Sequence, residues 1–464
     1  MIENNYLTLK NRATAVYKLI MKHQKKNYPI PYLNDLFVEL ETIYTMFIKK
    51  YFVSEDGLEI NAGELFKINR FINTTNELVL ATLNNASTIN NPKAITIPIK
   101  EKLEKSNGSA VYVPELIWMV NYHVGEISGI YNRIVKSIGL DSSLGIHLYR
   151  FGIPHFYQDD VLMSGIIGHE LGHYFDLYGG LDISEKILAK LTNDSNFIDS
   201  LLQFVVCEDN ETLNTGSKQD VVKIFLIQHY MKNWIREFIA DVLGIVFYGP
   251  ASFFASERLI QSVNFNNEDI GTSDLVSITH PCNLLRLNIK KLTLEKMGYD
   301  NLPTPFVSEI EKSTLVWESA SRIYNRDVRI IGKVRGKNVG FDANSASLSL
   351  IEEYLSTHFE YIIEFCLSEV PDELIYHTKS MEDSIEILAY KLGQLLPPNE
   401  LHHNVPSDSI SIINAGWLAY FLPSQLLISK YKNNDDLLEA INNMLIRSLE
   451  VASIHRRWID VDTE

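Results

Sequence analysis

The sequence contains only three cysteines, Cys207, Cys282 and Cys366, and no two of them lie close together. So few and so widely separated cysteines exclude a disulfide-stapled scaffold and a zinc site built from CxxC pairs. Long apolar runs are also missing, because polar residues and proline interrupt the two most apolar stretches, 239–255 and 412–428. We therefore predict that both stretches are buried helices and not membrane spans.

Basic residues are in deficit, with 42 Lys and Arg against 58 Asp and Glu, which gives a formal net charge of −16. An acidic surface of this size disfavours binding to a phosphate backbone, so we expect no nucleic acid partner. The N-terminus lacks the apolar stretch after a basic start that is typical of a secretory signal. We expect a cytoplasmic protein with reduced cysteines and no membrane span, and its oligomeric state stays open.

Aromatic residues are abundant, and 23 Tyr, 21 Phe and 5 Trp provide enough apolar surface for a large core. Apolar residues at three- and four-residue spacing predict many helices. The main predicted helices span residues 5–26, 32–51, 64–84, 114–140, 158–177 and 219–248.

Alternating apolar residues predict strands at 94–99 and 145–157. The predicted fold class is therefore mainly α with a small β-sheet. A proline-containing loop after residue 300 is interpreted as a domain boundary. The predicted parts are an N-terminal helical region over 1–110, a core over 111–300 and a C-terminal helical region over 301–464.

The helix predicted over 158–177 contains the segment Gly-His-Glu-Leu-Gly-His, an HExxH motif. Its two histidines, His169 and His173, are four residues apart and share one helix face, so both can bind one metal ion. Glu170 follows the first histidine and can act as general base on the water that such a metal activates. The motif predicts a metal site on this helix.

Three glycines, Gly165, Gly168 and Gly172, recur at three- and four-residue spacing in the same helix. Each costs up to about 1 kcal/mol relative to alanine inside a helix. We therefore expect another backbone or a bulky group to approach this face closely.

A catalytic zinc site needs a third protein ligand and an open fourth position. Asp176 is excluded, because seven residues separate it from His169, which is about 10 Å along a helix. A metzincin pattern is excluded as well, because it requires glycine and histidine where this chain has Asp176 and Gly179.

A better source of ligands is the helix predicted over 219–248, which contains Glu237 and Asp241. These carboxylates are four residues apart, so they share one face. Burying them among the surrounding apolar residues is costly unless they meet a cation or hydrogen-bond donors. Zinc and the ring N–H of a ligand histidine would supply those partners.

The segment HELGH is followed 64 residues later by EFIAD, and this pair resembles the gluzincin metallopeptidases, specifically the group of HtpX-like and CaaX-prenyl proteases. Thr279-His280-Pro281, with Arg286 six positions after the histidine, is similar to the His-Pro…Arg segment of that group. The resemblance covers about residues 165–290. Unlike the membrane members of the group, this chain has no predicted membrane span.

The resemblance implies a zincin-like metallopeptidase core within 111–300. It implies one Zn²⁺ per chain, with His169, His173 and Glu237 as ligands. It also implies that Glu170 is the general base.

The resemblance implies further roles around the metal. Asp241 becomes the acceptor that orients a ligand histidine. His280 is expected to polarise the scissile carbonyl or to stabilise the oxyanion, a role that an electrophilic donor must fill. Arg286 is expected to support the His280 loop or the carboxylates.

The leading hypothesis is a zinc-dependent endopeptidase acting on a protein or peptide substrate. Two alternatives stay open at this point. One is a zinc-stabilised but proteolytically inactive interaction protein, and the other is a zinc hydrolase of a non-peptide amide. The presence of Glu170 favours chemistry, because zinc binding alone needs only the three ligands.

Overall fold

The computed structural model divides the chain into two compact units. Unit 1 comprises Met1–Lys93 and Asn107–Gln158, and unit 2 comprises Ala94–Ser106 and Asp159–Glu464. The structure describes residues 2–26, 28, 31–53, 61–86, 93–106, 110–117, 122–207, 214–228, 230–264, 273–277, 279–324, 328–334 and 337–463.

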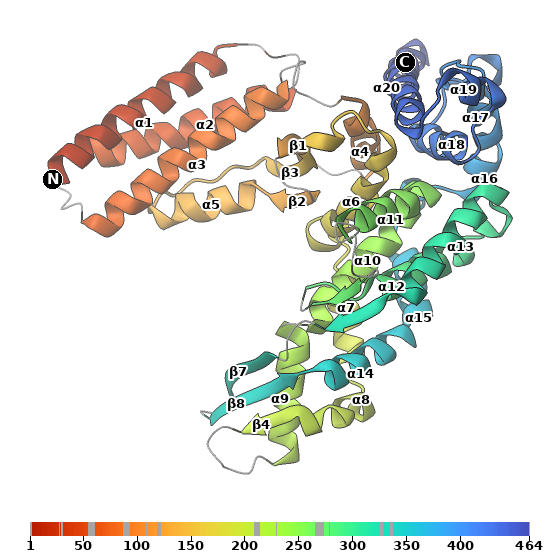
Figure 1. Cartoon of the computed structure of the whole chain (residues 1–464). Helices are drawn as coiled ribbons and strands as arrows, with labels where there is room; N and C mark the ends of the chain where they lie inside the picture. The colour runs from red at the N-terminus through yellow and green to blue at the C-terminus, as the bar shows by residue number, and fades with distance from the viewer. Residues whose placement is uncertain are drawn as a thin grey trace. The chain divides into compact units, whose positions relative to one another are not determined.

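Unit 1 combines long helices with a three-stranded mixed sheet (Figure 1). Its elements are α1 (Ile2–Gln24), α2 (Pro31–Ile48), η1 (Lys49–Val53), α3 (Ala62–Ala86), β1 (Ala110–Ile117), β2 (His123–Glu126), α5 (Ser128–Ser137), β3 (His147–Pro154) and η2 (His155–Tyr157). Strand β3 lies in the middle, parallel to β1 and antiparallel to β2. Fully buried aromatic rings, among them Tyr44, Phe47, Phe71 and Tyr131, fill the core of the unit.

Unit 2 carries most of the remaining helices and two further small sheets among the described residues. Its helices and turns up to residue 301 are α4 (Lys93–Lys105), η3 (Leu162–Gly165), α6 (Ile166–Leu177), α7 (Ile183–Leu191), α8 (Ser195–Ser200), η4 (Leu202–Phe204), α9 (Thr215–Gln228), α10 (Tyr230–Tyr248), α11 (Pro250–Asn264), α12 (Asn283–Lys296) and η5 (Tyr299–Asn301). Those that follow are α13 (Thr304–Ser319), α14 (Ser345–Ser356), α15 (Phe359–Glu369), η6 (Asp372–Leu374), α16 (Thr378–Glu382), α17 (Ile385–Gly393), η7 (His402–Asn404), α18 (Ser409–Phe421), α19 (Gln425–Lys430) and α20 (Asn434–Thr463).

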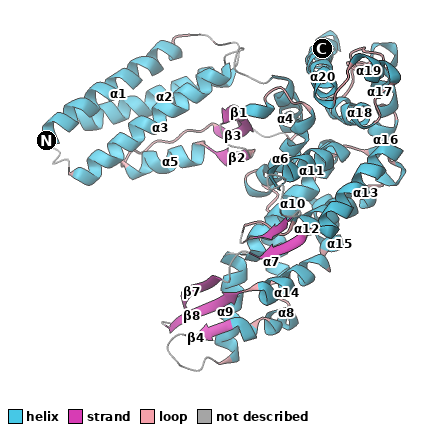
Figure 2. Cartoon of the chain, in the orientation of Figure 1, coloured by secondary structure: helices cyan, strands magenta, loops and turns pink. Residues whose placement is uncertain are grey.

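The strands of unit 2 are short, as Figure 2 shows. They are β4 (Val205–Cys207), β5 (Ser273–Val276), β6 (Ser321–Tyr324), β7 (Val328–Val334) and β8 (Lys337–Ala343). Strands β4, β8 and β7 form an antiparallel sheet, whereas β5 and β6 pair in parallel. The prediction of a mainly helical fold with little sheet is therefore confirmed, while the zincin-like core stays a prediction.

Helix α10 is the central element of unit 2. It packs against α6, α7, α11, α12 and α15, and from Phe238 to Tyr248 every side chain is buried. At Gly249 the backbone adopts φ of +60°, and α11 begins at Pro250. The stretch 239–255 lies in α10 and α11 and is buried, as predicted. The stretch 412–428 is buried only along most of α18, since Leu422, Leu426 and Ile428 are exposed. Among the described residues no helix combines the length and the apolarity that a membrane crossing requires.

Two predicted elements are wrong. Residues 94–99 are not a strand but the start of α4, because Ile95, Ile99 and Leu103 form a buried stripe at four-residue spacing. The helix predicted over 114–140 exists only as α5, since β1 and β2 occupy its first half.

Candidate metal centre

Helices α6 and α10 approach each other closely at the glycines of the HExxH helix. A Cβ added at Gly172 would lie 2.8 Å from the Cα of Ala240, and one added at Gly168 would lie 3.1 Å from the carbonyl oxygen of Gly244. Both contacts are with backbone atoms, which cannot move aside as a flexible side chain would. The expected close approach is therefore confirmed, and it brings the two motif helices together.

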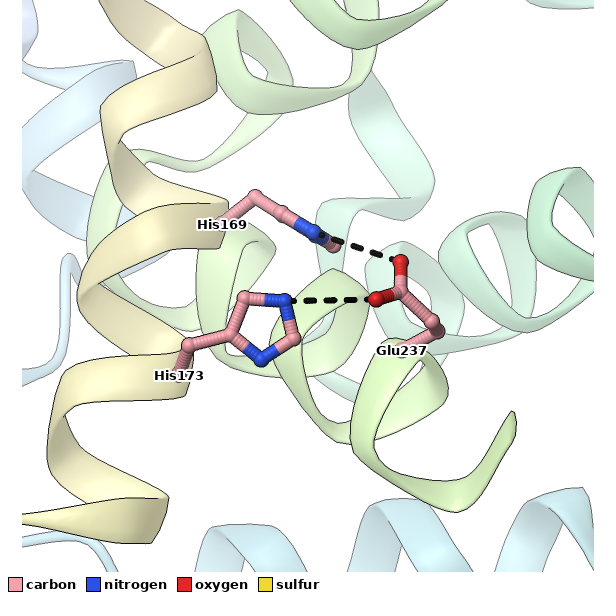
Figure 3. A group of neighbouring side chains, drawn as sticks. All are labelled: His169, His173 and Glu237. Atoms are coloured by element: carbon pink, nitrogen blue, oxygen red, sulfur yellow. Dashed lines mark ion pairs between the residues drawn. The ribbon is translucent and has the colours of Figure 1, made fainter. Parts of the chain in front are cut away.

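Three potential ligand atoms converge between these helices (Figure 3). The Nε2 atom of His169 lies 3.6 Å from Oε2 of Glu237, and Nε2 of His173 lies 3.5 Å from Oε1 of the same carboxylate. All three ligand atoms lie within 4.8 Å of one another. The three residues therefore offer one metal ion two imidazole nitrogens and one carboxylate oxygen.

Asp241 contacts the other ring nitrogen of His169. Its Oδ1 lies 3.0 Å from Nδ1 of His169, and its side chain is 1% exposed. A carboxylate at Nδ1 accepts the proton of that nitrogen and leaves the lone pair of Nε2 directed towards Glu237. The predicted contact between Asp241 and a motif histidine is thus present, and the histidine involved is His169.

Arg286 of α12 joins both carboxylates. Its Nε and Nη2 donate to the two oxygens of Asp241 at 2.7 and 2.8 Å, and its Nη1 lies 3.4 Å from Oε2 of Glu237. A planar guanidinium and a carboxylate form two parallel hydrogen bonds in this arrangement, which fixes their relative orientation. Of the two expected roles of Arg286, the structure places it at the carboxylates.

The electrostatics of the site keep both carboxylates ionised. Burial by itself would raise the pKa of Glu237 and of Asp241, but Arg286 and the histidines outweigh it and hold both pKa values far below their usual range. Burial likewise favours a lower pKa for His173, yet the hydrogen bond and charge of Glu237 raise it above its usual value. The cluster thus holds two ionised carboxylates that Arg286 and the histidines stabilise.

Glu170 and His280 lie at the periphery of this cluster. Glu170 is half-buried on α6, and its charge contributes to the raised pKa of His173. The Nε2 atom of His280 lies 3.8 Å from Oε1 of Glu237, and the side chain is 57% exposed. Partial burial of the ring lowers the pKa of His280, although Glu237 opposes this effect. All seven residues singled out in the sequence therefore belong to one neighbourhood of unit 2.

Two residues that position the His280 loop were not identified from the sequence. The indole of the buried Trp234 donates to the carbonyl oxygen of Ser277 at 2.9 Å. The carboxylate of Asp274, which is fully buried, accepts hydrogen bonds from the first backbone amides of α12, at Asn283 and Leu284. Their partners are backbone groups, which leave no pattern in a sequence.

Comparison with known proteins gives no match for this chain among protein-family models, curated proteins or solved structures. The resemblance to gluzincins therefore depends on the sequence motifs alone.

Proposed function

We propose that this chain is a zinc-dependent endopeptidase whose active site lies between α6, α10 and α12. The observation that carries the proposal is the convergence of His169, His173 and Glu237. They come from two helices, and 64 positions of sequence separate His173 from Glu237. Their order and spacing resemble those of gluzincin metallopeptidases. The proposed fold of this part of unit 2 is accordingly zincin-like.

Zinc suits the donor set of the cluster. Two imidazole nitrogens and one carboxylate oxygen make a three-ligand set of the kind that catalytic zinc sites use, with a fourth position left for water or substrate. Asp241 supports this ligand set without binding the metal itself, because its hydrogen bond to Nδ1 fixes the orientation of His169. We propose one zinc ion per chain on these three residues.

The bound zinc would supply Lewis acidity and would make water a nucleophile near neutral pH. Glu170, next to His169 on α6, accepts the proton of the attacking water and passes it to the leaving amine nitrogen. His280 presents Nε2 to the same space and donates a hydrogen bond to the carbonyl oxygen as negative charge develops on it. Protein or peptide is the proposed substrate class.

The proposal is tested by replacing the base alone. Glu170→Gln keeps the size of the side chain and its hydrogen-bonding capacity but removes the proton acceptor, so zinc content and folding should persist. Hydrolysis should fall by about 10²–10⁴-fold, the usual contribution of general acid–base catalysis. Proteome-wide identification of new N-termini, with wild type and Glu170→Gln compared, measures this loss. Equal cleavage by both proteins would refute the proposal.

A matched control tests whether the loss of cleavage depends on which carboxylate is removed. Glu373→Gln makes the same change at an exposed glutamate of η6 and should leave every cleavage product in place. If neither wild type nor variants cleave protein, but a cellular effect of the chain persists in Glu170→Gln, the zinc-stabilised interaction protein replaces the enzyme.

A further inference from the structure

The loop that carries His280 contains a compact set of hydrogen bonds. The backbone amide of His280 donates to Oγ of Ser277 at 3.0 Å, and the amide of Ser277 donates to the carbonyl oxygen of His280 at 3.0 Å. The Oγ1 atom of Thr279 lies 2.8 Å from Nδ1 of His280 and 3.2 Å from Oγ of Ser277. The imidazole of His280 therefore has a hydroxyl partner at Nδ1, whereas its Nε2 faces Glu237 of the metal centre.

A neutral imidazole carries one proton, and its neighbours decide which nitrogen holds it. At the Nε2 end of His280 lies a carboxylate oxygen of Glu237, 3.8 Å away, which can only accept. This neighbour favours the tautomer with the proton on Nε2, so Nδ1 must accept a hydrogen bond. The hydroxyl of Thr279 can donate to Nδ1, while the hydroxyl of Ser277 has two acceptors within reach, the carbonyl oxygen of His280 at 3.4 Å and Oγ1 of Thr279 at 3.2 Å.

We propose that Thr279 is a positioning residue that holds His280 in the tautomer with the proton on Nε2. The inference rests on the proposed function, in which Nε2–H donates to the carbonyl oxygen of the substrate. The opposite tautomer would present a lone pair to that oxygen as negative charge develops on it, and would repel it. One removed donor of this kind typically costs about 10²–10³-fold in kcat.

A second Thr–His pair in the chain provides a matched control. Thr357 Oγ1 lies 3.1 Å from Nδ1 of His358, but here the carbonyl oxygen of Tyr354 lies 2.8 Å from the same nitrogen. A carbonyl oxygen only accepts, so Nδ1 of His358 must carry the proton. Both pairs have the sequence Thr-His, but the acceptor lies at Nε2 in His280 and at Nδ1 in His358. We therefore expect the proton on Nε2 in His280 and on Nδ1 in His358.

The test is ¹⁵N NMR of the zinc-loaded full-length chain labelled at histidine, with His280 assigned through His280→Gln. We expect the proton on Nε2 in wild type and in Thr279→Ser. In Thr279→Val the proportion of the other tautomer should rise by about fivefold, the factor that corresponds to one net hydrogen bond. Thr357→Val should leave His280 unchanged. A proton on Nδ1 of His280 in wild type, or an unchanged spectrum in Thr279→Val, would overturn the proposal.

Activity measurements separate this proposal from the proposed function. If the chain cleaves peptides, Thr279→Val should lower kcat by at most about threefold with KM unchanged, because a fivefold shift of the equilibrium removes only part of a dominant tautomer, and Thr279→Ser should restore it. A change of kcat in Thr279→Val that does not match the loss of the Nε2–H tautomer measured by NMR contradicts the role of Thr279 and leaves the peptidase intact. If the expected tautomers are observed but no peptide is cleaved, the proposed peptidase function is refuted and the hydrogen-bond assignment of Thr279 is retained.

Discussion

At the scale of single residues, Asp241 accepts hydrogen bonds from two partners, His169 and Arg286. It accepts from Nδ1 of His169 through one oxygen, and both of its oxygens accept from the guanidinium of Arg286. Its negative charge therefore orients a proposed zinc ligand while it compensates a buried cation. Removal of one partner from such a network leaves the others with unsatisfied charge or protons.

Asp241→Asn should weaken the zinc site without abolishing it. The amide keeps the size of the side chain but loses the charge, and a partner of this kind typically contributes about 10–100-fold in metal affinity or activity. Competition with a zinc chelator measures the affinity. Asp199→Asn is the matched control, because Asp199 is exposed and accepts only from Gln219 among its described contacts. Equal zinc affinity of Asp241→Asn and wild type would show that Asp241 has no such role.

The candidate site was largely predictable at this scale, and the reason is local geometry. The spacing of His169 and His173, and of Glu237 and Asp241, determines which side chains share a helix face before any tertiary structure is known. The roles of Trp234 and Asp274 were not predictable, because each binds backbone groups of a loop that forms only in the folded chain.

At the scale of elements, the site depends on how closely α6 and α10 pack. The Gly172 position has no room for a methyl group, since an added Cβ would lie 2.8 Å from the Cα and 3.0 Å from the carbonyl oxygen of Ala240. Any larger residue must move one helix away from the other. That movement also changes the separation between His173 and Glu237.

Gly172→Ala should destabilise the fold by about 1–3 kcal/mol, the usual cost of overpacking a close contact, and should lower zinc affinity. Urea unfolding and chelator competition measure the two effects. Gly216→Ala in α9 is the matched control, because its added Cβ would meet only Asn214 Oδ1 at 3.8 Å. That control should be neutral or slightly stabilising. Equal stability of the two variants would contradict the packing argument.

Several strands and the helix α4 differ from what the sequence patterns predict. Ile95, Thr96 and Ile97 alternate as in a strand, yet the burial of Ile95 and Ile99 on unit 2 makes this segment the helix α4. Conversely, the strands β1 and β2 were read as helix, although Pro114 lies in β1 at the edge of the sheet, where a missing N–H is tolerated. Strands β6, β7 and β8 of the C-terminal region were also not predicted.

At the scale of the whole molecule, the compact units do not follow the predicted boundaries at 110 and 300. Residues 94–106 belong to unit 2 because α4 has partners far along the chain. Lys102 donates to the carbonyl oxygen of Leu374 at 2.6 Å, and Glu101 accepts from Ser409 and pairs with Arg456. Local patterns cannot reveal contacts over such separations, so a boundary read from loops and prolines could not separate α4 from unit 1.

The zinc content of the purified full-length chain tests the central claim most directly. Wild type, supplied with zinc and freed of excess metal, should hold one zinc ion per chain by plasma mass spectrometry, because three ligand atoms converge there. His169→Ala/His173→Ala should hold none, whereas the control His147→Ala/His402→Ala, which removes two exposed histidines, should hold one. Full zinc occupancy in His169→Ala/His173→Ala would contradict the account.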